Sequence, residues 1–184
     1  MLRSVATSGQ VIVNPATGET VTFLTTTAET GGRLLRIEMV AEPGRGGVLE
    51  HVHARMTERH ELQQGRLHFV IDGVERVLDA PASLEIPPMT RHSLRYGGDE
   101  RIRTVIEFEP PGRYEAFMET IAALARDGKT NAKGVPNLLQ TAVLAPDYLS
   151  VFALAKPPLW VQRAVFGALA PIGRLAGYKK TYPG

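Results

Sequence analysis

Apolar and polar positions alternate in short segments along residues 11–109 of this chain. In the segment 33–40, Leu35, Ile37 and Met39 recur at every second position and would share one face of a strand. Asp72-Gly73 separates two such runs and is a strong hairpin signature. Four segments carry strand patterns: 18–27, 33–40, 65–78 and 101–109. Short strands divided by Gly and Pro turns predict an antiparallel sandwich or barrel.

The hydrophobic period changes after Pro110. In the segment 113–128, which stops at a glycine, three apolar residues recur at helical spacing: Phe117, Ile121 and Leu124. The segment 138–156 predicts one or two helical pieces interrupted at Pro146. The segment 157–184 predicts a helix that starts at its prolines and is broken or kinked near Pro171. We therefore predict a β-barrel domain over 1–112 and an extension of about three helices over 113–184.

Composition narrows the chemistry that this chain can support. Hydrophobic residues make up 43% and charged residues 22% of the 184 positions, the balance of a soluble globular protein. The chain has no cysteine, so a metal site would have to use histidine and carboxylate ligands. The first residues lack the apolar core of a signal peptide, and a cytoplasmic location is expected.

Charge is unevenly distributed along the chain. Residues 1–147 have a net charge of −3 (16 Lys and Arg, 19 Asp and Glu), whereas residues 148–184 have five Lys and Arg and no acid. The basic residues do not form a nucleic-acid-binding motif, so no nucleic-acid partner is expected. Arg163 and Arg174 enclose too short an apolar segment to span a membrane. Packing on the barrel, capping its mouth or forming a dimer interface is favoured over lying on a membrane surface.

Three of the five histidines lie in the segment 51–65, "HVHARMTERHELQQG". His51 and His53 are two residues apart, so both imidazoles would point to one side of a strand. Glu58 follows after a connection short enough to bring its carboxylate to them, and His92 is the natural candidate for a fourth ligand. Three neutral imidazoles and a carboxylate suit a divalent transition metal ion such as Fe, Mn, Ni, Cu or Zn.

The same segment resembles the first motif of the cupin superfamily. In that motif, a His-x-His pair is followed by three or four residues, Glu, six residues and Gly, as in His51, His53, Glu58 and Gly65 here. The second cupin motif is matched at Pro87 and His92. It is not matched at three other positions: Pro81 and Met89 replace glycines, and Tyr96 replaces an asparagine. The resemblance implies that the ligand positions are kept and that the turn before His92 has changed.

The chain is also similar to a group of single-domain bacterial cupins with a helical C-terminal extension. The shared motifs are "NPATGE" at 14–19, "PPLWVQR" at 157–163 and "GYKKTYP" at 177–183. This resemblance covers nearly the whole chain and implies a mainly β fold: a cupin double-stranded β-helix (jelly-roll barrel) followed by helices. It implies no particular activity.

Two further residues are candidates for catalysis. His60 shares a strand face with Glu58, and Tyr96 shares one with His92. His60 could act as an acid or base near a metal; the interpretation we favour is that it fills an aromatic position and hydrogen-bonds to a neighbour. Tyr96 could orient a substrate or donate a proton, or it could pack at the barrel mouth.

The favoured function is a metal-dependent enzyme that acts on a small organic molecule inside the barrel. Among cupins with this ligand set, dioxygenases are the leading reaction class, and isomerases, lyases and cyclases share the scaffold. A non-catalytic cupin that binds a metal or a small ligand is the alternative. A homodimer is the expected assembly, because cupins often pair through their sheets.

Overall fold

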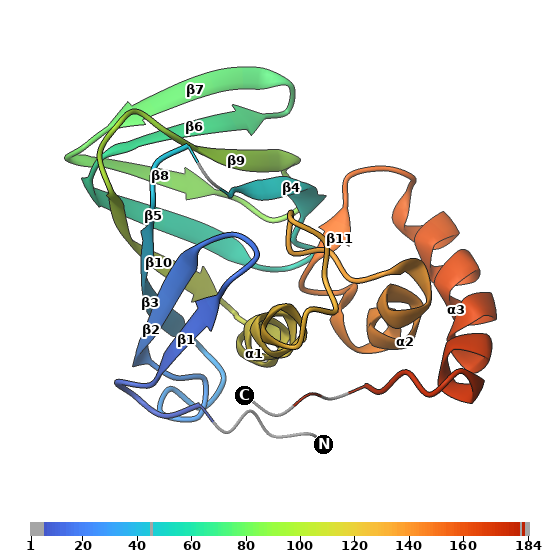
Figure 1. The fold of residues 1–184 in the computed structure, drawn as a ribbon. Coiled ribbons are helices and arrows are strands. Elements are labelled where there is room, and N and C mark those ends of the chain that lie inside the picture. Colours follow the sequence, from blue (N-terminus) through green and yellow to red (C-terminus); the bar gives the residue numbers. More distant parts are fainter. Residues whose placement is uncertain (1–5, 45, 181, 183–184) are drawn as a thin grey trace.

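A computed structural model describes residues 6–44, 46–180 and 182, in which two antiparallel sheets face each other and three helices follow (Figure 1). The strands are β1 (Val11–Asn14), β2 (Glu19–Thr25), β3 (Leu35–Ala41), β4 (Val48–Val52), β5 (Thr57–Gln64), β6 (Arg66–Ile71), β7 (Val74–Asp79), β8 (Ala82–Ile86), β9 (His92–Gly97), β10 (Ile102–Glu109) and β11 (Ala153–Leu154). The helices are α1 (Tyr114–Arg126), α2 (Leu138–Tyr148) and α3 (Leu159–Leu175).

The two sheets form a jelly-roll barrel. One sheet has the order β1-β2-β3-β10-β5-β8, and the other has the order β11-β4-β9-β6-β7. Neighbouring strands in both sheets are antiparallel. From β3 to β6, and again from β7 to β11, the chain changes sheet with each strand. The strands β4 and β9 of one sheet therefore face β5 of the other across one interior. The predicted double-stranded β-helix with helices after it is confirmed.

The barrel core follows from the alternation in the sequence. Leu35, Ile37 and Met39 are all buried, and β3 pairs with β10 so that Ile37 lies opposite Ile106. Asp72 and Gly73 both have positive φ, as the predicted hairpin between β6 and β7 requires.

Two predictions about the extension were wrong. The segment 138–156 was predicted to be helical, but α2 ends at Tyr148 and residues 153–154 form β11, which pairs with β4. Pairing with an exposed strand edge thus outweighed the local helical pattern. Pro146 does not interrupt its helix, since α2 continues to Tyr148, and Pro171 does not break α3, which continues to Leu175. Packing of α2 against α3 compensates for the hydrogen bond that each proline removes.

The extension closes one side of the barrel. Figure 1 shows α1 beside the strands, α2 next to it and α3 farthest from the barrel. The first helix is confirmed, and it ends before Gly128, which has a φ of 68°. No helix among the described residues is both long and apolar enough to cross a membrane. The division at residue 112 stays a prediction, and β11 shows that the extension also supplies a strand to the barrel.

Candidate metal centre

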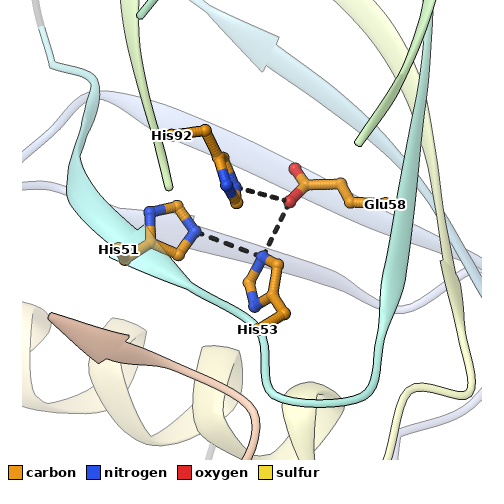
Figure 2. A group of neighbouring side chains, drawn as sticks. All are labelled: His51, His53, Glu58 and His92. Atoms are coloured by element: carbon orange, nitrogen blue, oxygen red, sulfur yellow. Dashed lines mark hydrogen bonds and ion pairs between the residues drawn. The ribbon is translucent and has the colours of Figure 1, made fainter. Parts of the chain in front are cut away.

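Strands from both sheets bring four predicted ligands to one point in the barrel (Figure 2). His51 lies at the end of β4, in register opposite His92 at the start of β9. His53 follows β4 directly, and a tight connection leads to Glu58 on β5. The structure therefore brings His51, His53, Glu58 and His92 together, and all four are buried.

The ligand atoms of these residues are close enough to share one ion. His53 Nε2 lies 2.8 Å from Glu58 Oε2, and His92 Nε2 lies 3.2 Å from the same oxygen. His51 Nε2 and His53 Nε2 are 3.2 Å apart. All four ligand atoms lie within 4.8 Å of one another. Two atoms bound at about 2.1 Å to one metal ion are separated by about 3 Å, so these distances fit a shared ion.

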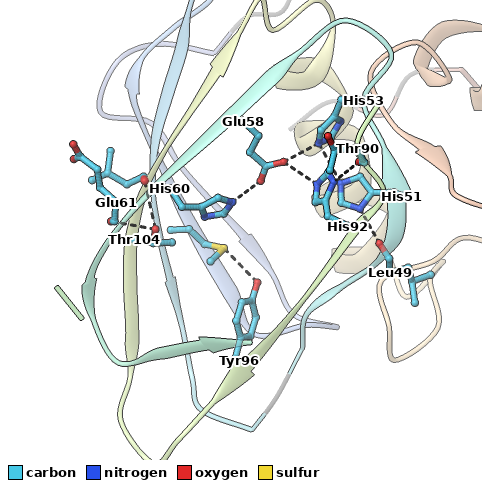
Figure 3. Close-up of polar contacts among 12 residues, drawn as sticks. Leu49, His51, His53, Glu58, His60, Glu61, Thr90, His92, Tyr96 and Thr104 are labelled. Atoms are coloured by element: carbon cyan, nitrogen blue, oxygen red, sulfur yellow. Dashed lines mark hydrogen bonds and ion pairs between the residues drawn. The ribbon is translucent and has the colours of Figure 1, made fainter. Parts of the chain in front are cut away.

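The backbone determines which ring nitrogen of each histidine faces the centre. The Nδ1 atoms of His51, His53 and His92 lie within hydrogen-bonding distance of carbonyl oxygens of Leu49 (2.7 Å), Val151 (2.6 Å) and Thr90 (2.9 Å), respectively. Figure 3 shows the carbonyls of Leu49 and Thr90 on the outer side of the rings. A carbonyl can only accept, so each Nδ1 donates and each neutral ring turns the lone pair of Nε2 inward.

The positions of the ring nitrogens and of the carboxylate show whether a cation would fit the site. Three imidazole lone pairs and the carboxylate of Glu58 converge, and neutral rings with Nδ1 protonated have no hydrogen to place between them. Converging acceptors repel one another in a buried site unless a positive charge lies between them. The residues present therefore fit a divalent metal ion.

The electrostatics of the cluster keep two of the four ligands, His51 and Glu58, in their binding forms. Burial, together with nearby His92 and His53, lowers the pKa of His51 to about 3, so this ring stays neutral. Burial alone would raise the pKa of Glu58, but contacts with His53, His60 and His92 outweigh it and hold that pKa well below the ordinary value. The carboxylate is therefore ionised. Burial lowers the pKa of His92, but the adjacent Glu58 raises it overall.

His60 lies beside the four ligands. Its Nε2 donates to Glu58 Oε1 at 2.7 Å, so one carboxylate oxygen faces the ligand cluster and the other holds His60 (Figure 3). The ring is 1% exposed and meets Phe69 edge-to-face at 5.1 Å. His60 thus fills an aromatic position and hydrogen-bonds to a neighbour, which is the interpretation favoured from the sequence. Its Nδ1 is buried and remains without a hydrogen-bond partner among the described residues.

Tyr96 is placed differently from the other candidates. Its hydroxyl donates to Glu19 and lies 3.3 Å from the sulfur of Met39, and Figure 3 shows the side chain apart from the ligand cluster. Burial raises the pKa of Tyr96 well above its ordinary value, with a further contribution from Glu19. The phenol is therefore neutral. Its catalytic role stays a prediction.

Sequence reasoning missed three residues of the extension that touch the ligands. The carbonyl of Val151 holds His53, and the ring of Phe152 stacks on His51 at 4.3 Å. Tyr114 of α1 meets His53 edge-to-face at 5.6 Å. No local pattern marks these residues, because their place depends on β11 pairing with β4 and on α1 covering the barrel.

A cavity of about 280 Å³ lies between the barrel and the helices. Glu58 and His60 lie on its wall, so the cavity reaches the ligand cluster. Most of the wall is aliphatic or aromatic, with contributions from both parts of the chain: Val21, Ile37, Met39, Leu94, Phe108, Phe117, Ile121, Leu144 and Phe152. Such a wall suits a small, largely apolar molecule.

Comparisons with known proteins give likenesses to solved structures only. No protein-family model matches the sequence, and no curated protein matches it either. A KdgF structure from a Halomonas species is 18% identical, covers 50% of this chain and 79% of its own, and has a TM-score of 0.45. An RmlC-like cupin from Shewanella frigidimarina is 21% identical over 59% and 91%, with a TM-score of 0.47. A predicted oxalate decarboxylase from Thermotoga maritima is 18% identical over 59% and 97%, with a TM-score of 0.49.

Topology and motif spacing define the class of this protein. The two antiparallel sheets face each other in jelly-roll order. Of the His-x-His pair, one histidine lies on β4 and the other just past its end, the glutamate lies on β5, and the third histidine lies on β9. The chain is a cupin-fold protein with a helical C-terminal extension.

Proposed function

We propose that this protein is a metal-dependent enzyme that acts on a small, largely apolar organic molecule. One observation carries the proposal: four lone-pair donors converge on a buried point at the wall of a cavity. A structural ion is usually enclosed by protein ligands, whereas a catalytic ion keeps access to a space that a substrate can enter. We further propose the reaction class inferred from the sequence, a dioxygenase-type oxidation, together with a homodimeric assembly and a cytoplasmic location.

Different residues would have different roles in such a site: metal binding, hydrogen bonding to the substrate and exclusion of water. His51, His53, Glu58 and His92 would hold a first-row divalent ion, which when bound supplies Lewis-acid or oxygen-activating chemistry. His60 is proposed to accept a hydrogen bond from the substrate at Nδ1 while its Nε2 stays bound to Glu58. The apolar walls and the helices would exclude water around the reacting molecule.

Elemental analysis tests the metal site. Protein purified without added metal is expected to carry about one first-row transition ion per chain. The double variant His51→Ala/His53→Ala is expected to lose that ion and to keep its fold. His68→Ala is the matched control, because His68 lies on β6 and outside the cluster. Equal metal content in the double variant and the control would mean that the ion binds elsewhere.

Ligand exchange separates an enzyme from a non-catalytic metal-binding cupin. Azide or cyanide added to the metal-loaded protein is expected to change the electronic or magnetic resonance spectrum of the ion, because a catalytic ion has an exchangeable position. An unchanged spectrum at saturating anion would support the non-catalytic alternative.

A further inference from the structure

The inner face of helix α3 packs against the rest of the protein. Its buried residues recur at helical spacing: Gln162, Phe166, Ala170 and Gly173. The Gln162 amide donates to the carbonyls of Leu154 and Pro157, both at 2.7 Å. A Cβ at Gly173 would lie 2.7 Å from a Val143 methyl, so α2 approaches the backbone of α3 closely here. The rotation of α3 about its own axis is therefore set.

The outer face of α3 is apolar as well, which is unusual for a helix at the protein surface. Residues spaced i, i+4, i+8, i+11 and i+15 form one exposed stripe: Trp160, Ala164, Ala168, Pro171 and Leu175. Trp160 is 73% exposed and Leu175 is 90% exposed, and exposed Val165 and Ile172 adjoin them. A contiguous apolar patch of this kind marks an interaction surface.

Every charged residue of α3 and of the segment that follows it is basic. Arg163 and Arg174, spaced i and i+11, border the apolar stripe on one side and are exposed. Exposed Lys179 and Lys180 follow the helix, and Lys180 also lies 3.6 Å from Asp147 on α2. Residues 148–184 contain no acid. A partner for this face should therefore combine an apolar interior with negative charge at its surface.

We propose that the outer face of α3 docks on the surface of an anionic lipid bilayer. Trp160 and Leu175 would enter the boundary between headgroups and acyl chains, and Arg163 would meet lipid phosphates. A second copy of the chain fits this face less well. Pairing two such faces would bring the arginines of both copies together, with no acid in either segment to offset them. The inference uses only the outer face of α3 and does not depend on the proposed chemistry.

The position of α3 links this docking to the cavity. Gln162 and Phe166, on the inner face, lie on the cavity wall. A docked α3 would thus separate the lipid surface from the apolar cavity by the width of a single helix.

Vesicle binding by the full-length protein tests the proposal, and Trp160 provides an internal probe because it is the only tryptophan of the chain. The protein is expected to co-sediment with vesicles made of equal amounts of phosphatidylcholine and phosphatidylglycerol, and less with phosphatidylcholine alone. Trp160 fluorescence should shift to the blue on binding as the indole leaves water. Added sodium chloride should weaken binding by screening the charges.

Two variants separate the apolar contribution from the charged one. Leu175→Glu is expected to weaken binding at least about tenfold, because it places a carboxylate in the apolar stripe. Arg163→Gln is expected to weaken binding to the anionic vesicles about fivefold, with little effect on the neutral ones. Val74→Glu on β7 is the matched control, since Val74 is 60% exposed but lies in the barrel, and it should bind as the wild type does.

Absence of co-sedimentation and of a fluorescence shift with anionic vesicles would overturn the proposal. Equal binding by Leu175→Glu and Val74→Glu would overturn it too, because lipid would then contact another face. Light scattering after size exclusion gives an independent result. If Leu175→Glu turns a dimer into a monomer, the face is an interface between copies of this chain and the membrane proposal is wrong.

Discussion

The candidate metal centre is bordered by the barrel on one side and by the C-terminal extension on the other, and the two sides contribute differently to the site. The barrel wall supplies every group that would hold the ion, from the short segment 51–58 and His92. The wall from the extension supplies no ligand, but it orients two of them: the Val151 carbonyl holds His53, and Phe152 stacks on His51. The ligands His51, His53 and Glu58 are therefore close together in sequence, whereas the orientation of His51 and His53 also depends on residues about a hundred positions away.

This difference gives the extension a role beyond covering the barrel. A histidine ligand binds well only when its other ring nitrogen has a fixed partner, because that partner sets the tautomer and the ring direction. For His53 the partner is a backbone carbonyl just before β11, so pairing of β11 with β4 completes the site. The two parts of the chain should accordingly lose stability and metal binding together.

Removing the second and third helices should have the largest effect. A chain that ends at Pro136 lacks Leu144, Tyr148 and Val151, which belong to the main core cluster. Each lost core side chain costs about 2–4 kcal/mol, and together these losses approach the total stability of a typical domain, about 5–15 kcal/mol. We expect aggregation, binding of a hydrophobic dye and loss of metal.

The control for this truncation is a chain that ends at Lys180, which keeps α3 and should stay soluble and bind metal. A soluble, metal-loaded protein that ends at Pro136 would instead show that the barrel is complete by itself. The extension would then be an independent appendage.

Phe152→Ala should have the next largest effect. Its ring stacks on His51 at 4.3 Å and on Phe117 at 5.1 Å, so truncation opens space on one side of a ligand. We expect the free energy of unfolding to fall by about 2–4 kcal/mol and the metal affinity to fall about tenfold. Chemical denaturation and competition with a metal indicator measure the two quantities.

Phe166→Ala is the matched control for Phe152→Ala. Phe166 belongs to a separate apolar cluster with Ala142 and Ala145, so its truncation should cost stability without changing metal affinity. Equal metal affinities in the two variants would mean that the extension supports the fold but not the ligands.

The sequence was informative where structure depends on near neighbours. The two-residue period located β3 and β10, Asp72-Gly73 located the hairpin, and the spacing of His51, His53 and Glu58 identified the segment that meets His92. These features need only strand geometry and a short connection. β11 could not be found in this way, because two residues of strand are too few to carry a period and their pairing partner lies far away in the sequence.

His60→Phe should have a smaller effect on stability and a selective one on the site. Phenylalanine fills the same position against Phe69, but it removes the donor that holds Glu58 Oε1. We expect the fold and the bound ion to remain and the metal affinity to fall about tenfold, as for other residues that orient a ligand. His68→Phe on β6 controls for the added ring. Metal affinity equal to that of the control would mean that the contact from His60 does not orient Glu58 for metal binding.

Glu19→Gln should have the smallest effect, on the pH dependence of stability. Burial raises the pKa of Glu19 above its ordinary value of 4.5, although the hydrogen bond from Tyr96 opposes this. As the pH rises through 4.5, the Glu19 carboxyl ionises in the unfolded protein before it ionises in the folded protein. The free energy of unfolding therefore falls with rising pH until the pH exceeds the pKa of Glu19 in the folded protein. Glutamine can still accept from Tyr96 and does not ionise. Urea unfolding across this range should therefore show a flatter profile for Glu19→Gln than for Glu75→Gln, whose side chain is 79% exposed. Parallel profiles would mean that water reaches Glu19 and that the cavity is open where Glu19 lines it.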